Sequence, residues 1–220
     1  MSALEAAAKI ERSRLVLVRH GASECNAKRI VGGPRGCTGL SATGLMQAKA
    51  LRVRLERSGE LEAAGALYSS VLARAVETAE VIAPAVGGLE VIEDCGLCEL
   101  HPGDADGLGW DEVARRYGTI DFRSHPHQAI APSGESWSSF AGRASSRLES
   151  VMDRHPGQLV VVACHAGVVA ASVARFLQMP GPHAGLGLRC ENTSITRWER
   201  DAGGGWELIA YNDAAHLEEL

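Results

Sequence analysis

The stretch "LVVVACHAG", residues 159–167, decides the fold class of this chain. It opens with five apolar residues, three of them valine, which is typical of a short strand buried on both faces of a sheet. The strand ends at Cys164 and His165, and the residues from Gly167 to Leu177 have the pattern of a helix. A buried strand followed directly by a helix is typical of the parallel sheets of α/β proteins.

The rest of the chain repeats this alternation of short apolar runs and helical periodicity. We expect further strands near residues 15–18, 66–68, 89–92, 194–198 and 206–211. We expect helices from a cap at Ser41 onward and over residues 71–86, 110–117 and 136–155. The pattern predicts a single α/β domain with a mainly parallel sheet over residues 13–220. Residues 1–12 are expected to form an N-terminal extension, and residues 94–135 an irregular insertion that covers the edge of the sheet where ligands bind, beyond the carboxyl ends of the strands.

The composition excludes several classes of protein. Hydrophobic residues make up 45% of the 220 residues and charged residues 22%, which is typical of a globular chain rather than a disordered one. The net charge of −5, without a run of Lys and Arg, argues against nucleic acid as a partner. No apolar run approaches the roughly 20 residues that cross a bilayer, so we expect no membrane partner. Residues 1–12 lack the features of a signal peptide, which predicts a cytoplasmic protein.

The six cysteines, at positions 25, 37, 95, 98, 164 and 190, are expected to be reduced thiols in that compartment. Cys95 and Cys98 form a C-x-x-C pair. No second pair follows at a zinc-like spacing, so the pattern does not favour a redox or zinc site there.

Chemistry-bearing residues follow three of the expected strands. The first strand ends in Arg19 and His20, the second leads to Arg74 in the first turns of its helix, and the strand at 159–163 leads to His165. Each residue alone has an ordinary explanation, such as a loop histidine or a solvated arginine. Because the carboxyl ends of parallel strands meet at one edge of a sheet, we expect these four side chains to converge. Two histidines and two arginines in one place predict an anion site that contains titratable groups.

Several longer segments occur in an order that resembles one known family. They are "RHGASECN" (19–26), "LSATGLMQA" (40–48), "YSSVLARAVETAE" (68–80), "LCELHPGDADG" (97–107), "PSGES" (132–136), "VVVACHAGVV" (160–169), "NTSI" (192–195) and "NDAAHL" (212–217). On these segments the chain resembles the histidine phosphatase superfamily, the phosphoglycerate mutase-like proteins, from Leu15 to Leu217. The resemblance implies a three-layer α/β/α sandwich.

The resemblance also implies a mechanism that suits the residues present. His20 would attack phosphorus and form a phosphohistidine, and Glu99 would be the general acid and base. Arg19, Arg74 and His165 would bind the phosphoryl oxygens. Asn26 and the backbone near Gly21 and Ala166 would complete the phosphate site, since the glycines that follow both histidines (21 and 167) allow a ligand to approach closely. No metal and no cofactor are expected, because the positive side chains supply the charge.

Some alternatives remain open at this point. Asp104 and Asp106 are alternatives to Glu99, and together with His101 they could also be metal ligands. The chain departs from the family at Ala22, where Glu is common, and at Cys25, where Trp is common.

The roles of residues in the Gly-rich loop 32–39 and in the insertion are less defined. The roles of Arg29 and Arg35 are open, and Trp110, Arg123, His125 and His127 are candidates for the mouth of the site.

The first hypothesis from the resemblance is that the protein is a phosphomonoesterase that acts on a small phosphate ester. A phosphoglycerate mutase-type transferase is the second, kept open by the stretch Glu99 to Gly103, and a non-catalytic phosphate-binding module is the third. The sequence allows a homodimer.

Overall fold

The computed structural model describes residues 12–181 and 187–218, so the expected extension at 1–12 lies outside the described residues except for Arg12. Its centre is a sheet with strand order β3-β2-β4-β1-β5-β6. The strands are β1 (Ser13–Arg19), β2 (Ala66–Ser69), β3 (Val91–Glu93), β4 (Leu159–Cys164), β5 (Ile195–Arg200) and β6 (Trp206–Asp213). The four strands β3, β2, β4 and β1 are parallel, and β5 and β6 add an antiparallel edge. The expected mainly parallel sheet is confirmed.

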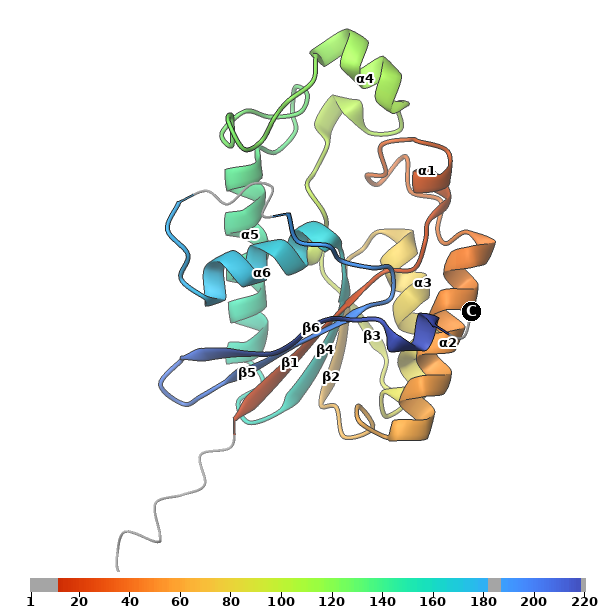
Figure 1. Cartoon of the computed structure of the whole chain (residues 1–220), viewed down its shortest axis with the longest axis vertical. Helices are drawn as coiled ribbons and strands as arrows, with labels where there is room; N and C mark the ends of the chain where they lie inside the picture. Colours follow the sequence, from red (N-terminus) through yellow and green to blue (C-terminus); the bar gives the residue numbers. More distant parts are fainter. Residues whose placement is uncertain (1–11, 182–186, 219–220) are drawn as a thin grey trace, which may run out of the picture.

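Helices cover both faces of this sheet (Figure 1). The α-helices are α1 (Glu24–Ala27), α2 (Ala42–Ser58), α3 (Ala73–Ile82), α4 (Trp110–Tyr117), α5 (Trp137–Asp153) and α6 (Ala166–Phe176). Short 3-10 turns are η1 (Ala83–Ala85), η2 (Cys95–Leu97), η3 (Gly103–Ala105) and η4 (Ala215–Leu217). Helices α5 and α6 lie on one side of the sheet and α2 and α3 on the other, which is the three-layer α/β/α arrangement.

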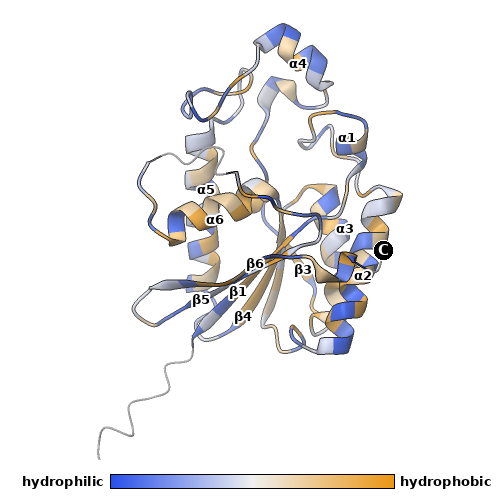
Figure 2. Cartoon of the chain, viewed as in Figure 1, coloured by the Kyte–Doolittle hydropathy of each residue, from blue (hydrophilic) through white to orange (hydrophobic). Residues whose placement is uncertain are grey.

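Strand β1 shows why the short apolar runs form the middle of the protein. Successive side chains of a strand point to opposite faces. Leu15 and Leu17 belong to the core under α5 and α6, whereas Val16 and Val18 belong to the core under α2 and α3. Buried apolar residues of the four helices belong to the same two cores, and Figure 2 shows hydrophobic residues along the central strands and on part of each helix. A strand with both faces buried needs apolar residues at every position, which the run at 15–18 provides.

Most element boundaries differ from the predictions by one or two residues, and the larger differences have physical causes. Strand β3 begins at Val91 rather than at residue 89. The predicted helix 71–86 is shorter, since α3 ends at Ile82 and Pro84 lies in a separate 3-10 turn; proline has no N–H with which to continue an α-helix. Helix α1 was not predicted, because one turn of helix is too short for a periodic signal. The cap at Ser41 is confirmed, as its side chain accepts from the N–H of Gly44 at 3.2 Å.

The segment 94–135 rises beyond the carboxyl ends of the parallel strands, with α4 at its far end (Figure 1). It contains η2, η3 and α4, which agrees with the predicted short helix at 110–117. Within the described residues, no helix combines the length and the apolar character that a membrane span requires.

Candidate active site

The adjacent strands β1 and β4 bring the two histidines together. Their parallel register pairs Arg19 with Cys164, so the next residues, His20 and His165, lie side by side. The backbone N–H of His20 donates to the carbonyl of Cys164 at 2.9 Å, and the two imidazole rings are 5.1 Å apart between centroids. Both side chains are buried, with 4% and 0% of their surface exposed. The convergence expected from the strand ends is present.

The hydrogen bonds of His20 determine which of its nitrogens can act as a nucleophile. Nδ1 lies 2.7 Å from the carbonyl oxygen of Gly21, and because a carbonyl only accepts, Nδ1 carries the proton. Nε2 therefore has the lone pair, and Nε of Arg74 donates to it at 3.1 Å. Burial, and then the charge of Arg74, hold the pKa of His20 well below its ordinary value. His20 is thus neutral, with Nε2 available for attack.

Arg74 is the residue that links the parts of the site. It lies in the first turn of α3, and Nη1 donates to the carbonyl of Gly32 at 2.8 Å. Nη2 donates to Nδ1 of His165 at 3.2 Å. The other nitrogen of His165, Nε2, therefore carries the proton and donates to Oγ of Ser70 at 2.7 Å. Burial and the charge of Arg74 also keep the pKa of His165 well below its ordinary value.

Arg19 adds a second positive charge beside the histidines and contributes to the lowered pKa of His20. Its Nη1 donates to the carbonyl of Cys190. Its Nε is buried and has no hydrogen-bond partner among the described residues. A buried guanidinium N–H without a partner is costly unless an anion binds to it. Within the described residues, Arg19 therefore keeps one N–H without a partner, although it is not among the residues that line the cavity.

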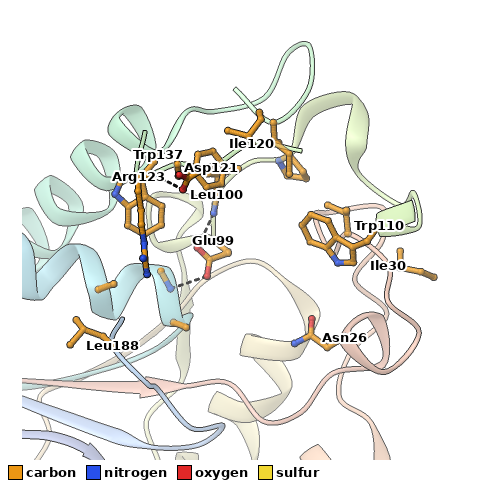
Figure 3. A pocket seen from close by; sticks show the side chains of 18 of the residues that line it. Asn26, Ile30, Glu99, Leu100, Trp110, Ile120, Asp121, Arg123, Trp137 and Leu188 are labelled. Atoms are coloured by element: carbon orange, nitrogen blue, oxygen red, sulfur yellow. Dashed lines mark hydrogen bonds between the residues drawn. The ribbon is translucent and has the colours of Figure 1, made fainter. Parts of the chain in front are cut away.

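Glu99 lines the cavity next to these residues and is held by two backbone N–H groups (Figure 3). Oε2 accepts from Gly167 at 3.0 Å, and Oε1 accepts from Leu100 at 3.1 Å. A Cβ at position 167 would lie 2.1 Å from Oε1 of Glu99. The space at Gly167, which we had expected to admit a ligand, thus accommodates the Glu99 carboxylate.

Gly21 also differs from the expectation that its backbone binds phosphate. Its N–H donates to Oγ1 of Thr78 at 3.1 Å, and its carbonyl orients His20. A Cβ at Gly21 would lie 2.5 Å from the carbonyl oxygen of Gly44 in α2. We therefore assign Gly21 to packing against α2 and to orienting His20.

A cavity of about 680 Å³ opens above the site. Asn26, Arg74, Glu99 and Ala166 line it, as do Trp110 and Arg123 among the candidates for the mouth. His125 and His127 are exposed and are not part of its lining. The remaining wall is mostly apolar and comes from Ile30, Val31, Leu100, Ile120, Phe122, Ile130, Trp137 and Leu188. These apolar residues were not predicted, because no motif or period distinguishes them from core residues.

The two aspartates considered as alternatives to Glu99 lie elsewhere. Asp106 accepts from the backbone N–H groups of Arg35 and Gly36 at 2.8 and 3.0 Å, so it anchors the loop 32–39. Asp104 is exposed, and neither aspartate lines the cavity. In the described part of the chain, His101 does not form a ligand cluster with them, and its neighbours of that kind are cysteines. The structure does not support the metal interpretation of this triad.

Asn192 is a further residue of the site that was not predicted. Its side chain donates to the carbonyl of His20 at 2.9 Å, which holds the turn after β1 from the opposite side. The only signal for it is the segment "NTSI", which was recognised as a motif without a role. Arg29 pairs with Asp111 at the surface, 3.7 Å apart, and not with the buried histidines.

Comparison with known proteins identifies the family of the chain. The family model described as "Histidine phosphatase superfamily (branch 1)" matches residues 15–214. A metal-independent phosphoserine phosphatase of Arabidopsis thaliana is 34% identical, over 96% of this chain and 85% of the relative. Phosphoglycerate mutase-like protein 4 of the same plant is 32% identical, over 96% and 89%.

A solved structure gives the same result for the fold. A mycobacterial glucosyl-3-phosphoglycerate phosphatase, in complex with VO3, superimposes with a TM-score of 0.74 at 26% identity, over 91% of this chain and 99% of that one. The family match spans both histidines, Arg74 and Glu99, which are the residues that the fold brings together. The chain belongs to branch 1 of the histidine phosphatase superfamily, whose members act as phosphatases or mutases.

Proposed function

We propose that this protein is a phosphomonoesterase that hydrolyses a small phosphorylated metabolite through a phosphohistidine on His20. The observation that carries the proposal is the pair of hydrogen bonds to the two ring nitrogens of His20. Nδ1 donates to the carbonyl of Gly21, so the lone pair is on Nε2, and that nitrogen faces Arg74. A neutral, oriented imidazole next to a guanidinium is suited to attack a bound phosphoryl group.

The reaction has two steps. In the first, a bond forms between Nε2 of His20 and phosphorus, the ester P–O bond breaks, and Glu99 gives a proton to the leaving oxygen. In the second, Glu99 takes a proton from water, which attacks phosphorus and releases phosphate from His20. The Gly21 carbonyl keeps its hydrogen bond to Nδ1 throughout, which stabilises the positive charge on the phosphorylated ring.

The side chains around His20 supply the positive charge that the transferred group needs. Arg74 and Asn26, which line the cavity, would bind its oxygens, and Arg19 would add positive charge beside His20. The one N–H of neutral His165 is used by Ser70. A bound phosphate dianion favours the protonated imidazole, which then has a second N–H for a phosphoryl oxygen. The proposed chemistry needs no metal ion.

The cavity wall indicates the organic part of the substrate. Its side chains are mostly aliphatic and aromatic, and Trp110 and Trp137 lie on opposite sides of the opening (Figure 3). Arg123 also lines it, and its guanidinium forms no ion pair within the described residues. We propose a phosphate ester that has an apolar group, with a second anionic group placed near Arg123.

Transfer of the phosphoryl group to a second substrate, as in a mutase, is the alternative. It is favoured by the 32% identity to a phosphoglycerate mutase-like protein over nearly the whole chain. Both activities use the same nucleophile and acid, so the residues of the site do not separate them.

The test is a panel of phosphate esters assayed for released phosphate, with 3-phosphoglycerate, phosphoserine, an aryl phosphate and an apolar acyl-chain phosphate. We expect His20-dependent release of phosphate, fastest for an ester with an apolar group. The Arg123→Gln variant should raise KM for carboxylate-bearing esters and leave KM for neutral esters unchanged. Transfer between phosphoglycerates with little release of phosphate would favour the mutase. Binding of the esters without either reaction would favour a binding module.

A further inference from the structure

Cys95 and Cys98 are placed on the same side of the chain by local geometry. The 3-10 turn η2 begins at Cys95, and its hydrogen bond runs from the N–H of Cys98 to the carbonyl of Cys95 at 3.1 Å. In a 3-10 helix the side chains at positions i and i+3 lie one above the other. The two sulfur atoms are accordingly 3.7 Å apart, and both cysteines are free thiols.

His101 completes a cluster with these two thiols. Its Nε2 lies 3.5 Å from Sγ of Cys95, and the three ligand atoms all lie within 4.8 Å of one another. A tetrahedral zinc ion with Zn–S of about 2.3 Å and Zn–N of about 2.0 Å would separate two sulfurs by roughly 3.8 Å and sulfur from nitrogen by roughly 3.5 Å. Two of the three edges of the cluster therefore match a zinc site.

A carboxylate lies near the ring of His101, and backbone hydrogen bonds fix the main chain there. Nδ1 of His101 lies 3.6 Å from Oε2 of Glu135, on the opposite side of the ring from Cys95. The backbone N–H of His101 donates to the same oxygen at 2.9 Å, and the N–H of Glu135 donates to the carbonyl of His101 at 2.8 Å. Histidine ligands of zinc usually have a carboxylate or carbonyl at the nitrogen that does not bind the metal.

Arg143 of α5 holds the turn that presents the thiols. Its Nη1 donates to the carbonyls of Gly96 and Cys98 at 3.0 and 3.1 Å, and its guanidinium pairs with Glu135 at 2.7 Å. Burial raises the pKa of the Cys98 thiol to about 11, so a bound metal ion would have to stabilise its thiolate. The backbone that carries the three ligands is thus fixed from outside the cluster.

We propose that Cys95, Cys98 and His101 bind one Zn²⁺ ion. Two thiolates and an imidazole suit zinc better than hard cations such as Mg²⁺ or Ca²⁺. On binding, the two thiols release their protons to solvent, and the two thiolate charges balance the charge of the ion. Cys95 is exposed, so water completes the fourth position. This site revises the expectation of no metal, which considered the cysteine pair and His101 separately.

The zinc site lies outside the catalytic cavity, which none of its three ligands lines. It is nevertheless close to the catalytic acid in the chain, because Glu99 follows Cys98 directly and precedes His101 by two residues. Zinc would therefore stabilise the turn from which Glu99 projects. The proposal rests on the ligand geometry and does not depend on the proposed phosphatase activity.

The test is a titration of the reduced, metal-free protein with Zn²⁺ against a chromophoric chelator, and with Co²⁺ as a spectroscopic probe. We expect one ion per chain, thiolate-to-cobalt charge transfer and tetrahedral d–d bands. Cys95→Ser and His101→Asn should each weaken binding at least about tenfold. Cys190→Ser and His127→Asn are the matched controls outside the cluster and should keep the wild-type affinity. The unfolding midpoint should rise with Zn²⁺ in the wild type and the controls only.

Three results would overturn the proposal. The first is wild-type affinity in folded Cys95→Ser and His101→Asn proteins. The second is a cobalt spectrum without thiolate charge transfer. The third is that the reduced wild type does not bind zinc. If oxidation then removes two thiols from the wild type but none from Cys95→Ser, the two cysteines form a disulfide instead of a zinc site.

Discussion

Nε of Arg74 donates to Nε2 of His20 over 3.1 Å, so the cation that we propose to bind phosphate contacts the nucleophile directly. The same guanidinium contacts His165 and the carbonyl of Gly32. An incoming phosphoryl group offers Arg74 negatively charged oxygens, which are stronger acceptors than an imidazole nitrogen. Binding of phosphate would therefore draw Arg74 away from Nε2 of His20. The lone pair on Nε2 would then be free to attack the phosphorus atom next to it.

Replacing Arg74 with lysine tests this arrangement. Lysine keeps the charge but has one compact ammonium group in place of a planar fork, so it cannot contact both histidines and Gly32 together. We expect kcat/KM to fall about 10²- to 10³-fold, the range for loss of one transition-state donor. Steady-state kinetics on an aryl phosphate measures it. A loss of less than fivefold would show that only the charge of Arg74 matters.

The His20→Ala variant should lose turnover by at least about 10³-fold while keeping its fold. No other single substitution in the pocket should cost as much, because only His20 forms the covalent bond. Thermal unfolding and circular dichroism report whether the variant is folded. When the wild type reacts with a labelled ester and the reaction is stopped rapidly without acid, a labelled phosphohistidine should be trapped. The variant should not give this labelled species. Activity close to wild type in a folded His20→Ala protein would disprove the mechanism.

Catalysis should survive EDTA and be inhibited by vanadate. The two arginines and His165 supply the charge that a metal ion would supply elsewhere, and vanadate can bind Nε2 of His20 as a five-coordinate mimic of the transition state. Activity is measured after dialysis against EDTA, with and without added Zn²⁺. Removal of zinc from the proposed site at Cys95, Cys98 and His101 should leave the chemical step intact. Loss of turnover in EDTA, restored by a metal ion, would contradict the proposed chemistry.

The sequence was sufficient for the fold class and for the convergence of His20, Arg74 and His165. Apolar runs without alternation specify strands buried on both faces, and parallel strands place their carboxyl ends at one edge. Those rules depend on local pattern and topology only, so they needed no knowledge of packing.

Other features depend on contacts between distant segments and could not be predicted. The N–H of Gly167 binds Glu99, 68 residues earlier in the chain, and Asn192 binds the carbonyl of His20 from 172 residues away. Neither contact leaves a periodic signal. The proposed zinc ligands were missed for a different reason, since C-x-x-C and His101 were assessed apart, and only the turn η2 shows that they meet.

Gly167→Ala should damage the function of Glu99 without touching His20. A Cβ there would lie 2.1 Å from Oε1 of Glu99 and must displace it. Alkyl phosphates, whose leaving oxygen needs a proton, should slow about 10²-fold or more, the range for general acid catalysis. A nitrophenyl phosphate should slow much less, because its leaving group departs as an anion.

Two further variants make this comparison decisive. Glu99→Gln should give the same contrast between substrates as Gly167→Ala. Gly142→Ala, in α5, is the matched control, since its Cβ would meet nothing within 4 Å, and it should leave both rates unchanged. Equal losses on both substrates in Glu99→Gln would show that Glu99 is not the general acid.

Three buried histidines should make the protein less stable as the pH falls below neutrality. Burial is the first cause of the lowered pKa of His20 and His165, and burial lowers the pKa of His216 to about 4. In the unfolded chain a histidine takes up a proton near pH 6.5, whereas these three stay neutral in the folded state until the pH is well below that value. The unfolded state therefore binds more protons between these limits, and the free energy of unfolding decreases on acidification.

The window from pH 7.5 to 5.5 isolates this effect from the titration of ordinary carboxylates, which stay ionised there. Over this window each buried histidine should lower the free energy of unfolding by roughly 1 kcal/mol, and urea denaturation at several pH values measures the sum. His216 is the one to replace, because it contacts Thr193 at 2.8 Å and lies outside the catalytic cavity. The His216→Asn variant should have a shallower pH dependence than the wild type, whatever its stability at pH 7.5. An unfolding free energy that rises between pH 7.5 and 5.5, or a slope unaffected by His216→Asn, would mean that these histidines are not neutral in the folded protein.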